Sequence, residues 1–484
     1  MNLQDEMCAS IPERQCLLDD SAPSNPAAYA NRTCWQGSVP TYYINASNVS
    51  DVQYALAWAK ENGIPLSIKA SGHDYMGRSG GRGSLMIWMA GFEGLEYDDA
   101  FVPEGCSATV GASLVITAGS GVNMGAAYDF ADEHNVTVVG GYATTISWSG
   151  GYVQGGGHSV LSPVYGLAAD RVLQFKVVTP DGVLRTANAC QHPDLFWALR
   201  GGGGGTFGIV LEATHQVEPV APLVVASISF TANSTNLAPF YGIAVDNALE
   251  WASQGWGGHF RGAAMLFVNP LLDLSNAADT MASVVSYAEA QGGSATFTEF
   301  ASYYNFFRDY VTSTNGAGVG SILIPNTFLM PKQVFSGTAT RSQLAEFFAS
   351  FIATGAIPYV SVVGPYLFKS TANSTSTLPA WRDTIWQIGT YAFWSWNNTL
   401  AERKALVETM ETLGAPLQAL SGSAVYSNEG NPFTSNWQAS FWGENYPRLL
   451  AIKQKYDPDG VLGCFKCVGW DQQLADSSCW SAFE

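Results

Sequence analysis

The 484-residue sequence contains few charged residues and is especially poor in basic ones. Charged side chains make up 13% of it, and 22 Lys and Arg stand against 40 Asp and Glu, which gives a formal net charge of −18. Proteins bind nucleic-acid phosphates by displacing counterions with Lys and Arg, so this balance excludes a nucleic-acid partner. It disfavours an anionic membrane surface for the same reason. The sequence also lacks an apolar run near the roughly 20 residues of a membrane-spanning helix.

Patterns typical of metal centres are missing as well. The six His residues form neither a His-x-His nor a His-Glu-x-x-His pattern. Cys464-x-x-Cys467 lacks the second ligand pair that a structural zinc site needs, since only Cys479 follows it. The eight Cys form an even number, which favours disulfides in an oxidising compartment without specifying how they pair. We therefore expect disulfides and no metal.

Secretion is indicated by Asn-x-Ser/Thr acceptors, although no signal peptide is visible. The first ten residues contain no basic region and no apolar core, and we expect Met1 to mark a trimmed or engineered start. N-linked glycans would help to keep a charge-poor surface soluble. We expect an extracellular monomer that is glycosylated at several of the seven acceptors, which are Asn31, Asn45, Asn48, Asn135, Asn233, Asn373 and Asn397.

From Pro40 onward the sequence alternates between strand-like and helix-like segments. Residues 41–45 predict a strand, and Ser50, with Gln53 three residues later, predicts the capped start of a helix that ends at Gly63. Pro180-Asp-Gly182 predicts the turn of a hairpin over residues 171–187. Three further segments predict a strand, a helix and a strand, at residues 136–145, 194–200 and 208–214.

Two motifs are rejected because of their context. Gly203-x-Gly205-x-x-Gly208 matches the dinucleotide fingerprint, but a helix precedes it and a strand follows, which reverses the order that brings a pyrophosphate to a helix N-terminus. Gly77-x-Ser79-x-Gly81 matches a nucleophile elbow, but a strand rather than a helix comes next. The sequence therefore indicates neither a Rossmann nicotinamide site nor a serine hydrolase.

Three glycine-rich stretches instead indicate a ligand that lies against the backbone. In residues 71–84, small residues leave N–H groups free to converge on an anion such as a pyrophosphate, and His73 within this loop could bond covalently to a flavin. Residues 150–158 and 201–210 would let a flat ring approach the chain closely. The alternatives are a surface loop with a solvated His and purely structural turns.

These segments resemble a known family. A set of segments between Tyr42 and Val210 is similar to the FAD domain of the vanillyl-alcohol oxidase/p-cresol methylhydroxylase superfamily. Asn436–Leu450 with Lys453–Pro458 resembles the C-terminal segment of berberine bridge enzyme-like oxidases. Among these, the sequence is most similar to fungal secreted members of the isoamyl alcohol oxidase type. The resemblance covers residues 37–218 and 415–470, and the middle is matched by position only. The segments between Tyr42 and Val210 that carry the resemblance are Tyr42-Tyr-Ile, Asp51-Val-Gln-Tyr-Ala-Leu, Ser71-Gly-His-Asp-Tyr-Met-Gly-Arg-Ser79, Gly155-Gly-Gly-His-Ser159, Tyr165-Gly-Leu-Ala-Ala-Asp170 and Asp194 to Val210.

The resemblance implies an α+β fold in four segments. An N-terminal segment (1–36) precedes an FAD-binding domain of the p-cresol methylhydroxylase type (37–218), an α+β substrate domain with an antiparallel sheet (219–415) and a C-terminal segment that returns to the FAD domain (416–484). Composition also shifts near Val217, which supports a boundary there.

The resemblance also implies an FAD cofactor attached through His73. Many relatives add a second bond from a Cys eleven residues before the Gly-Gly-Gly-His-like stretch, and in this sequence that position is Thr144, which cannot form a thioether. We therefore expect a single covalent link. The residues expected to contact FAD are Ser71, Gly72, His73, Asp74, Gly77, Arg78, Ser79, Gly141, Thr144, Gly150, Gly151, Gly156, Gly157, His158, Ile209, Val210 and Asn445.

The family places its catalytic base on a Tyr-x-Asn-x strand, which in this sequence is Tyr426-Ser-Asn428-Glu429. Oxidation of an alcohol removes a hydride and a proton, so a base must lie near the hydroxyl. We expect burial to raise the pKa of Glu429 toward neutral so that it serves as this base, with Tyr426 polarising the substrate. The alternative is that Glu429 is an exposed turn residue.

Aromatic residues are concentrated in the middle of the chain. Tyr303, Tyr304, Phe306 and Phe307 fit the packing of a helix into the core. Trp394 and Trp396 lie two apart on a strand expected over residues 387–396, so they would share one face and line a pocket wall. Such a wall suits an aromatic, terpenoid or sugar ring equally.

The function expected from the sequence is a secreted FAD-dependent oxidase that acts on an alcohol of a small organic molecule and reduces O2 to H2O2. One alternative is a carbohydrate oxidase of the same superfamily, against which Thr144 argues, since those relatives commonly use two covalent links. The other is a secreted glycan-binding protein without cofactor, which the intact His73 and glycine stretches oppose.

Overall fold

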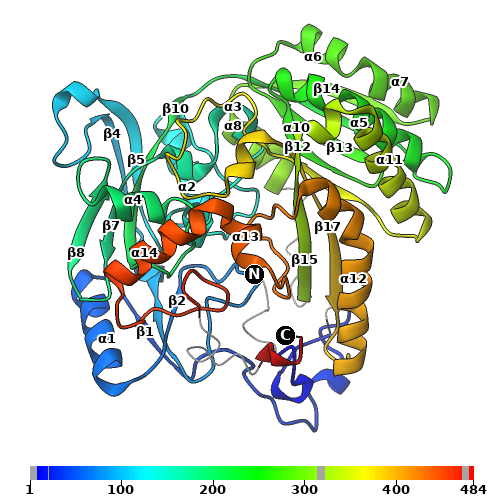
Figure 1. Ribbon diagram of the computed structural model, residues 1–484. Helices are drawn as coiled ribbons and strands as arrows, with labels where there is room; N and C mark the ends of the chain where they lie inside the picture. Colours follow the sequence, from blue (N-terminus) through cyan, green and yellow to red (C-terminus); the bar gives the residue numbers. More distant parts are fainter. Residues whose placement is uncertain (1–7, 20, 313–321, 471–478, 484) are drawn as a thin grey trace.

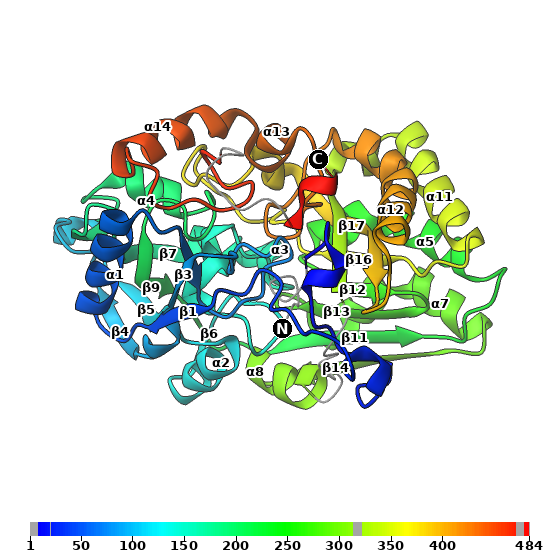
Figure 2. The same cartoon turned by 90° about the horizontal axis from the view of Figure 1, so that it is seen from below.

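The computed structural model describes residues 8–19, 21–312, 322–470 and 479–483, which form an α+β protein. Figure 1 shows two halves side by side, one built from residues 42–219 and the other from residues 223–421. Residues 437–456 return from the second half and lie across the first (Figures 1 and 2).

The first half begins with a small parallel sheet and one helix, α1 (Val49–Asn62). The expected strand and the helix end at Gly63, which has a φ of +62°, are confirmed, but the cap lies two residues earlier than expected. Asn48 and Asp51 form the capping box. The Gln53 side chain, expected to cap together with Ser50, donates instead to the Gly182 carbonyl at 2.7 Å. The sheet has the order β1 (Tyr42–Asn45), β3 (Leu85–Trp88), β2 (Leu66–Lys69).

A five-stranded antiparallel sheet completes this half. The hairpin turned at Pro180–Gly182, the helix α4 and the strand β9 are confirmed. The strand expected over residues 136–145 is limited to β6, because the chain then bends so that Thr144 can accept from the Gly125 N–H. The strand order is β4 (Leu95–Phe101), β5 (Ser113–Gly119), β9 (Ile209–Gln216), β7 (Val172–Val178), β8 (Leu184–Asn188). Beside it lie the pair β6 (Val136–Thr137) and β10 (Glu218–Pro219) and the helices α2 (Met124–Glu133), α3 (Ser162–Tyr165) and α4 (Pro193–Leu199).

The second half is one seven-stranded antiparallel sheet with helices on its outer face, as Figure 2 shows for α5, α11 and α12. The strand order is β14 (Ser294–Phe300), β11 (Leu223–Ser229), β13 (Ala264–Asn269), β12 (Gly257–Arg261), β16 (Tyr359–Val362), β17 (Thr384–Trp394), β15 (Ile322–Pro331). Its helices are α5 (Leu237–Ser253), α6 (Leu274–Thr280), α7 (Ala282–Ala290), α8 (Tyr303–Phe306), α10 (Lys332–Ser336), α11 (Thr338–Ala353) and α12 (Leu400–Ser421).

Strand alternation divides this sheet into an apolar face and a polar face. Phe260, Val360 and Ile388 are buried in the core beneath the helices. Their neighbours His259 and Tyr359 belong to the opposite face, which looks toward the first half. The sheet therefore presents polar and aromatic side chains where the two halves meet.

The prediction that Trp394 and Trp396 line one wall of a pocket is wrong. Trp394 ends β17 on the apolar face, is 3% exposed and lies 5.4 Å from the guanidinium of Arg403 in α12. Trp396 follows the end of the strand, and Arg32 lies 5.2 Å from its ring. The helical packing expected near residue 303 is confirmed for Tyr303, which is buried with Phe306 and Phe307.

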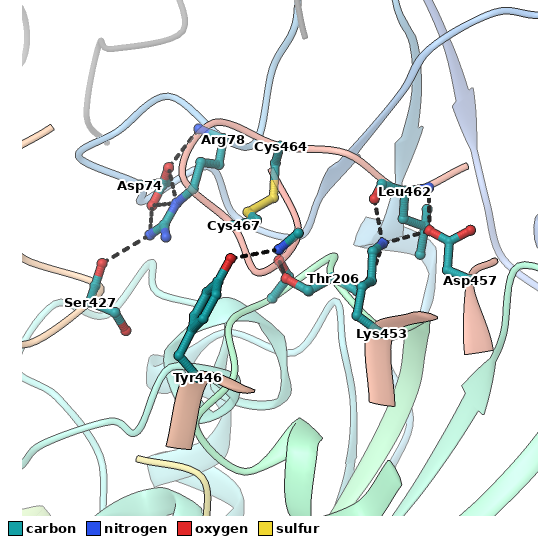
Figure 3. Close-up of a disulfide and its surroundings, with 12 residues drawn as sticks. Asp74, Arg78, Thr206, Ser427, Tyr446, Lys453, Asp457, Leu462, Cys464 and Cys467 are labelled. Carbon is teal, nitrogen blue, oxygen red and sulfur yellow. Dashed lines mark hydrogen bonds and ion pairs between the residues drawn. A yellow bond between two sulfur atoms is a disulfide. The ribbon is translucent and has the colours of Figure 1, made fainter. Parts of the chain in front are cut away.

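The helices α13 (Trp437–Trp442) and α14 (Tyr446–Tyr456) fasten the end of the chain to the first half. Lys453 is 6% exposed and donates through Nζ to the Thr206 carbonyl at 2.8 Å, to Asp457 and to the Leu462 carbonyl, both at 2.5 Å (Figure 3). Thr206 lies in the third glycine stretch, so this buried ammonium ties the C-terminal segment to it.

All eight Cys form disulfides, as expected: Cys8–Cys479, Cys16–Cys34, Cys106–Cys190 and Cys464–Cys467. Across the described residues, no helix has the length and hydropathy needed to cross a membrane. The same part of the chain contains no cluster of three His, Cys, Asp or Glu side chains placed to hold a metal ion.

Candidate cofactor and substrate site

A cavity of about 420 Å³ lies where the two halves meet. Its walls come from the 71–79 loop, the segment around residues 140–160, the third glycine stretch, the polar face of the seven-stranded sheet and the turn at residues 426–429. The cavity brings together most residues expected at the site: Ser71, Gly72, His73, Asp74, Arg78, Ser79, Gly141, Gly150, Gly151, His158, Val210, Tyr426, Asn428 and Glu429.

Six expected residues lie outside the cavity wall: Gly77, Thr144, Gly156, Gly157, Ile209 and Asn445. Thr144 is exposed, and it is the adjacent Thr145 that contacts His73. Ile209 points into the core packed around α1, and Asn445 is buried and donates to the Thr377 carbonyl at 2.9 Å. Gly157 has a φ of +73° and supports the wall from behind.

His73 lies at the cavity in a form suited to act as a nucleophile. Its Nε2 is 2.7 Å from the Thr145 hydroxyl oxygen, and among the described residues nothing hydrogen-bonds its Nδ1. Burial lowers the pKa of His73 to about 4, so the imidazole is neutral near neutral pH. A neutral imidazole keeps one ring nitrogen with a free lone pair.

Asp74 and Arg78 stiffen the loop around His73. Arg78 Nε lies 3.0 Å and Nη2 2.5 Å from Asp74 Oδ1, and the Arg78 backbone N–H donates to Oδ2 at 2.6 Å. Nη2 also reaches the Ser427 carbonyl at 3.4 Å, so the loop is tied to the turn that carries Glu429 (Figure 3). The Asp74–Arg78 ion pair therefore fixes the shape of the loop that carries His73.

Residues 426–429 form a turn rather than the expected strand. The Tyr426 hydroxyl accepts from the Gly157 N–H at 3.0 Å and from Asn428 Nδ2 at 2.8 Å. Asn428 Nδ2 also lies 3.1 Å from the Gly151 carbonyl. A Cβ on Gly155 would come within 2.2 Å of the Asn428 side chain, which explains why glycine is needed there. Tyr426 and Asn428 therefore pin the turn to the second glycine stretch.

Glu429 faces the cavity, and its pKa is not raised as expected. Burial alone would raise this pKa, but interactions with His158, Gln387 and His259 outweigh burial, so the net pKa lies below its ordinary value. Oε1 lies 3.0 Å from His158 Nε2, and Oε2 lies 2.9 Å from Gln387 Nε2. Glu429 is therefore a carboxylate at neutral pH with both oxygens engaged.

Sequence reasoning missed five aromatic or imidazole side chains of the wall: Tyr75, Tyr142, Tyr152, His259 and Tyr359. Tyr142 and Tyr152 each follow a Gly-Gly pair inside the segments already singled out, so that signal was available. His259 and Tyr359 stack 5.6 Å apart on neighbouring strands, and only the pairing of β12 with β16 brings them together.

The wall fits FAD on two observations. A Cβ on Gly151 would meet no protein atom within 4 Å, so the glycine leaves open cavity space beside the backbone. Three buried polar atoms of the wall have no hydrogen-bond partner among the described residues: Ser120 Oγ, Tyr142 OH and Gln154 Oε1. Buried polar groups need partners, so a large polar ligand would satisfy them.

Comparison with known proteins agrees with this geometry. Residues 40–188 match a family model described as an FAD binding domain, and residues 425–464 match one described as berberine and berberine like. The FAD-linked oxidoreductase ffsJ of Aspergillus flavipes is 40% identical over 504 residues, covering 96% of this chain and 82% of that protein.

Two solved flavoprotein structures have the same fold as this chain. The VAO-type flavoprotein MtVAO615 from Myceliophthora thermophila C1 has a TM-score of 0.81 and 27% identity, covering 96% of this chain and 88% of that one. The glucooligosaccharide oxidase from Acremonium strictum, described with a 6-S-cysteinyl, 8α-N1-histidyl FAD, has a TM-score of 0.73 and 21% identity, covering 89% and 92%. The chain therefore belongs to the FAD-linked oxidoreductases that combine an FAD binding domain with a C-terminal berberine-like segment.

Proposed function

We propose that this protein is a secreted oxidase that holds FAD through one covalent bond to His73 and oxidises an alcohol of a small organic substrate, with O2 as the final acceptor and H2O2 as product. When bound, FAD supplies the acceptor for the substrate hydride. The observation that carries the proposal is one cavity with a neutral imidazole on the 71–79 loop and an anchored carboxylate on the 426–429 turn.

The hydrogen bonds of His73 and the state of the cysteines support the single attachment. We propose that His73 Nε2–H donates to the Thr145 hydroxyl oxygen, which leaves the Nδ1 lone pair to attack the flavin 8-methyl carbon. All eight Cys are paired, so none is free to form a thioether. The Acremonium strictum oxidase carries a cysteinyl and a histidyl link, and we propose that this chain retains only the second.

The attachment is tested by acid precipitation of the purified protein. We expect the denatured wild type to stay yellow and His73→Ala to release its colour, while His134→Ala, a control outside the cavity, keeps it. Peptide mapping should find one flavinylated peptide, which contains His73. Release of free FAD from the denatured wild type, or any cysteinyl-flavin peptide, would contradict the proposal.

The substrate class is tested by a peroxide-coupled screen of alcohols and sugars. A carbohydrate is the second candidate, because Tyr75, Tyr142 and Tyr359 line the cavity and aromatic rings offer faces on which a sugar can stack. We expect peroxide with alcohols of small organic molecules. Peroxide with oligosaccharides alone would assign the second candidate instead.

Exposure of the glycosylation acceptors supports secretion. All seven acceptor asparagines are exposed, so each could carry an N-linked glycan without disturbing the core. The complete pairing of cysteines fits an oxidising compartment.

A further inference from the structure

The carboxylate of Glu429 is held by a chain of hydrogen bonds whose directions can be assigned. The Thr327 hydroxyl donates its one proton to the Glu429 carbonyl at 2.8 Å, so it accepts from Gln387 Nε2 at 3.0 Å. The second Nε2–H of Gln387 is then the one that donates to Glu429 Oε2 at 2.9 Å. Because Gln387 and Thr327 lie on the paired strands β17 and β15, the carboxylate is fixed by the sheet.

The other oxygen of this carboxylate fixes the proton position on His158. A carboxylate only accepts, so the 3.0 Å contact with Oε1 places a proton on His158 Nε2. In the neutral ring the lone pair is then on Nδ1. Among the described residues no group hydrogen-bonds Nδ1, and the His158 side chain lines the cavity at 16% exposure.

We propose that His158 is the catalytic base of the oxidation and that Glu429 is its positioning residue, an inference that rests on the proposed function. The substrate O–H bond breaks, and its proton goes to His158 Nδ1. The carbinol C–H bond breaks, and FAD, when bound, would accept its hydride with both electrons. The alcohol thereby becomes a carbonyl compound, and the imidazole becomes an imidazolium.

The surroundings favour His158 over Glu429 as proton acceptor. A proton placed on Glu429 would break a hydrogen bond to His158 or Gln387, whereas a proton on Nδ1 creates an imidazolium beside an anchored carboxylate, which stabilises it. Among the described residues, the Tyr426 ring lies 5.3 Å from the His158 ring, and His259, whose pKa burial lowers to about 3, interacts with His158 electrostatically. Neither brings a competing charge at neutral pH.

The decisive variant is His158→Gln in the purified flavoprotein. A Gln side chain can keep an N–H donor toward Glu429 while removing the Nδ1 lone pair, so a purely structural role of His158 predicts a wild-type rate. We expect flavin reduction by the alcohol found in the screen, followed anaerobically by stopped flow, to slow by about 10²–10⁴-fold. Flavin content should be unchanged, added imidazole should restore part of the rate, and His134→Gln, outside the cavity, should behave as wild type.

Glu429→Gln separates the two roles. We expect it to slow reduction as well and to move the acidic limb of the pH–rate profile to lower pH, because the imidazolium loses its carboxylate. If His158→Gln reduces at the wild-type rate while Glu429→Gln does not, Glu429 is the base and the inference is wrong, although the oxidase function stands.

A second measurement does not depend on turnover. ¹⁵N spectra of protein labelled at histidine should show His158 as the Nε2–H tautomer in the wild type and as a mixture in Glu429→Gln. A wild-type ring protonated on Nδ1 alone would overturn the inference whichever substrates are oxidised. A protein that oxidises no alcohol but shows the Nε2–H tautomer would refute the proposed function, not the proton assignment.

Discussion

Replacing Tyr426 with Phe tests whether this residue anchors the turn or takes part in the chemistry. The change removes the oxygen that accepts from the Gly157 N–H at 3.0 Å and from Asn428 Nδ2 at 2.8 Å. Asn428 Nδ2 still donates to the Gly151 and Tyr152 carbonyls, at 3.1 and 3.3 Å, so losing its hydrogen bond to Tyr426 costs little stability. The buried Gly157 N–H is left without an acceptor, which costs about 1–3 kcal/mol.

We therefore expect Tyr426→Phe to lower the free energy of unfolding by about 1–3 kcal/mol and to change the rate of flavin reduction by less than about tenfold. Urea unfolding followed by tryptophan fluorescence gives the first quantity, and anaerobic stopped flow gives the second. Tyr42→Phe is the matched control, because Tyr42 is 74% exposed. Unchanged stability together with a rate loss of about 10²-fold or more would show that the hydroxyl acts on the substrate.

Three further predictions concern stability and processing. Lys453→Met leaves the carboxylate of Asp457, with its side chain fully buried, without its counter-charge, and should destabilise the fold by about 3–5 kcal/mol in urea unfolding; an unchanged midpoint would show that the ion pair contributes nothing. Burial lowers the pKa of His215 to about 3 from 6.5, so the unfolded state binds a proton that the folded state does not within that window, and stability falls as the pH drops through it. Between pH 6.5 and 4.5 this amounts to about 2 kcal/mol, which His215→Gln should remove; equal pH dependence of both proteins would contradict the assignment. Enzymatic deglycosylation of the protein secreted from a eukaryotic host should increase its gel mobility, and unchanged mobility would exclude N-glycans.

Local signals in the sequence predicted the elements that depend on short-range chemistry. Gly63 ends α1 and the Pro180–Gly182 turn forms the β7–β8 hairpin, because the backbone conformation there is set by one or two residues. The start of α1 was misplaced because Asn48 with Asp51 and Ser50 with Gln53 offer the same spacing. Only the contact of Gln53 with Gly182, far along the chain, shows which pair caps the helix.

The candidate site was predictable where it consists of contiguous glycine-rich loops. His73 and Glu429 were expected at one site, and both line the cavity. The pKa of Glu429 could not be predicted, because its partners His158 and Gln387 are 271 and 42 residues away in sequence. The Trp394 assignment failed because alternation in β17 says which residues share a face but not which face the helices cover.

The Cys8–Cys479 disulfide joins residues 471 positions apart and so closes nearly the whole chain into a covalent ring. A single cut by a protease in any loop between these residues converts the ring into a linear chain but releases no fragment. The two halves that form the cavity then stay joined at whichever end the cut leaves intact, and non-reducing electrophoresis would show one band where reducing electrophoresis shows two. In the secreted state proposed above, such a closed chain would keep both walls of the cavity together after a first proteolytic cleavage.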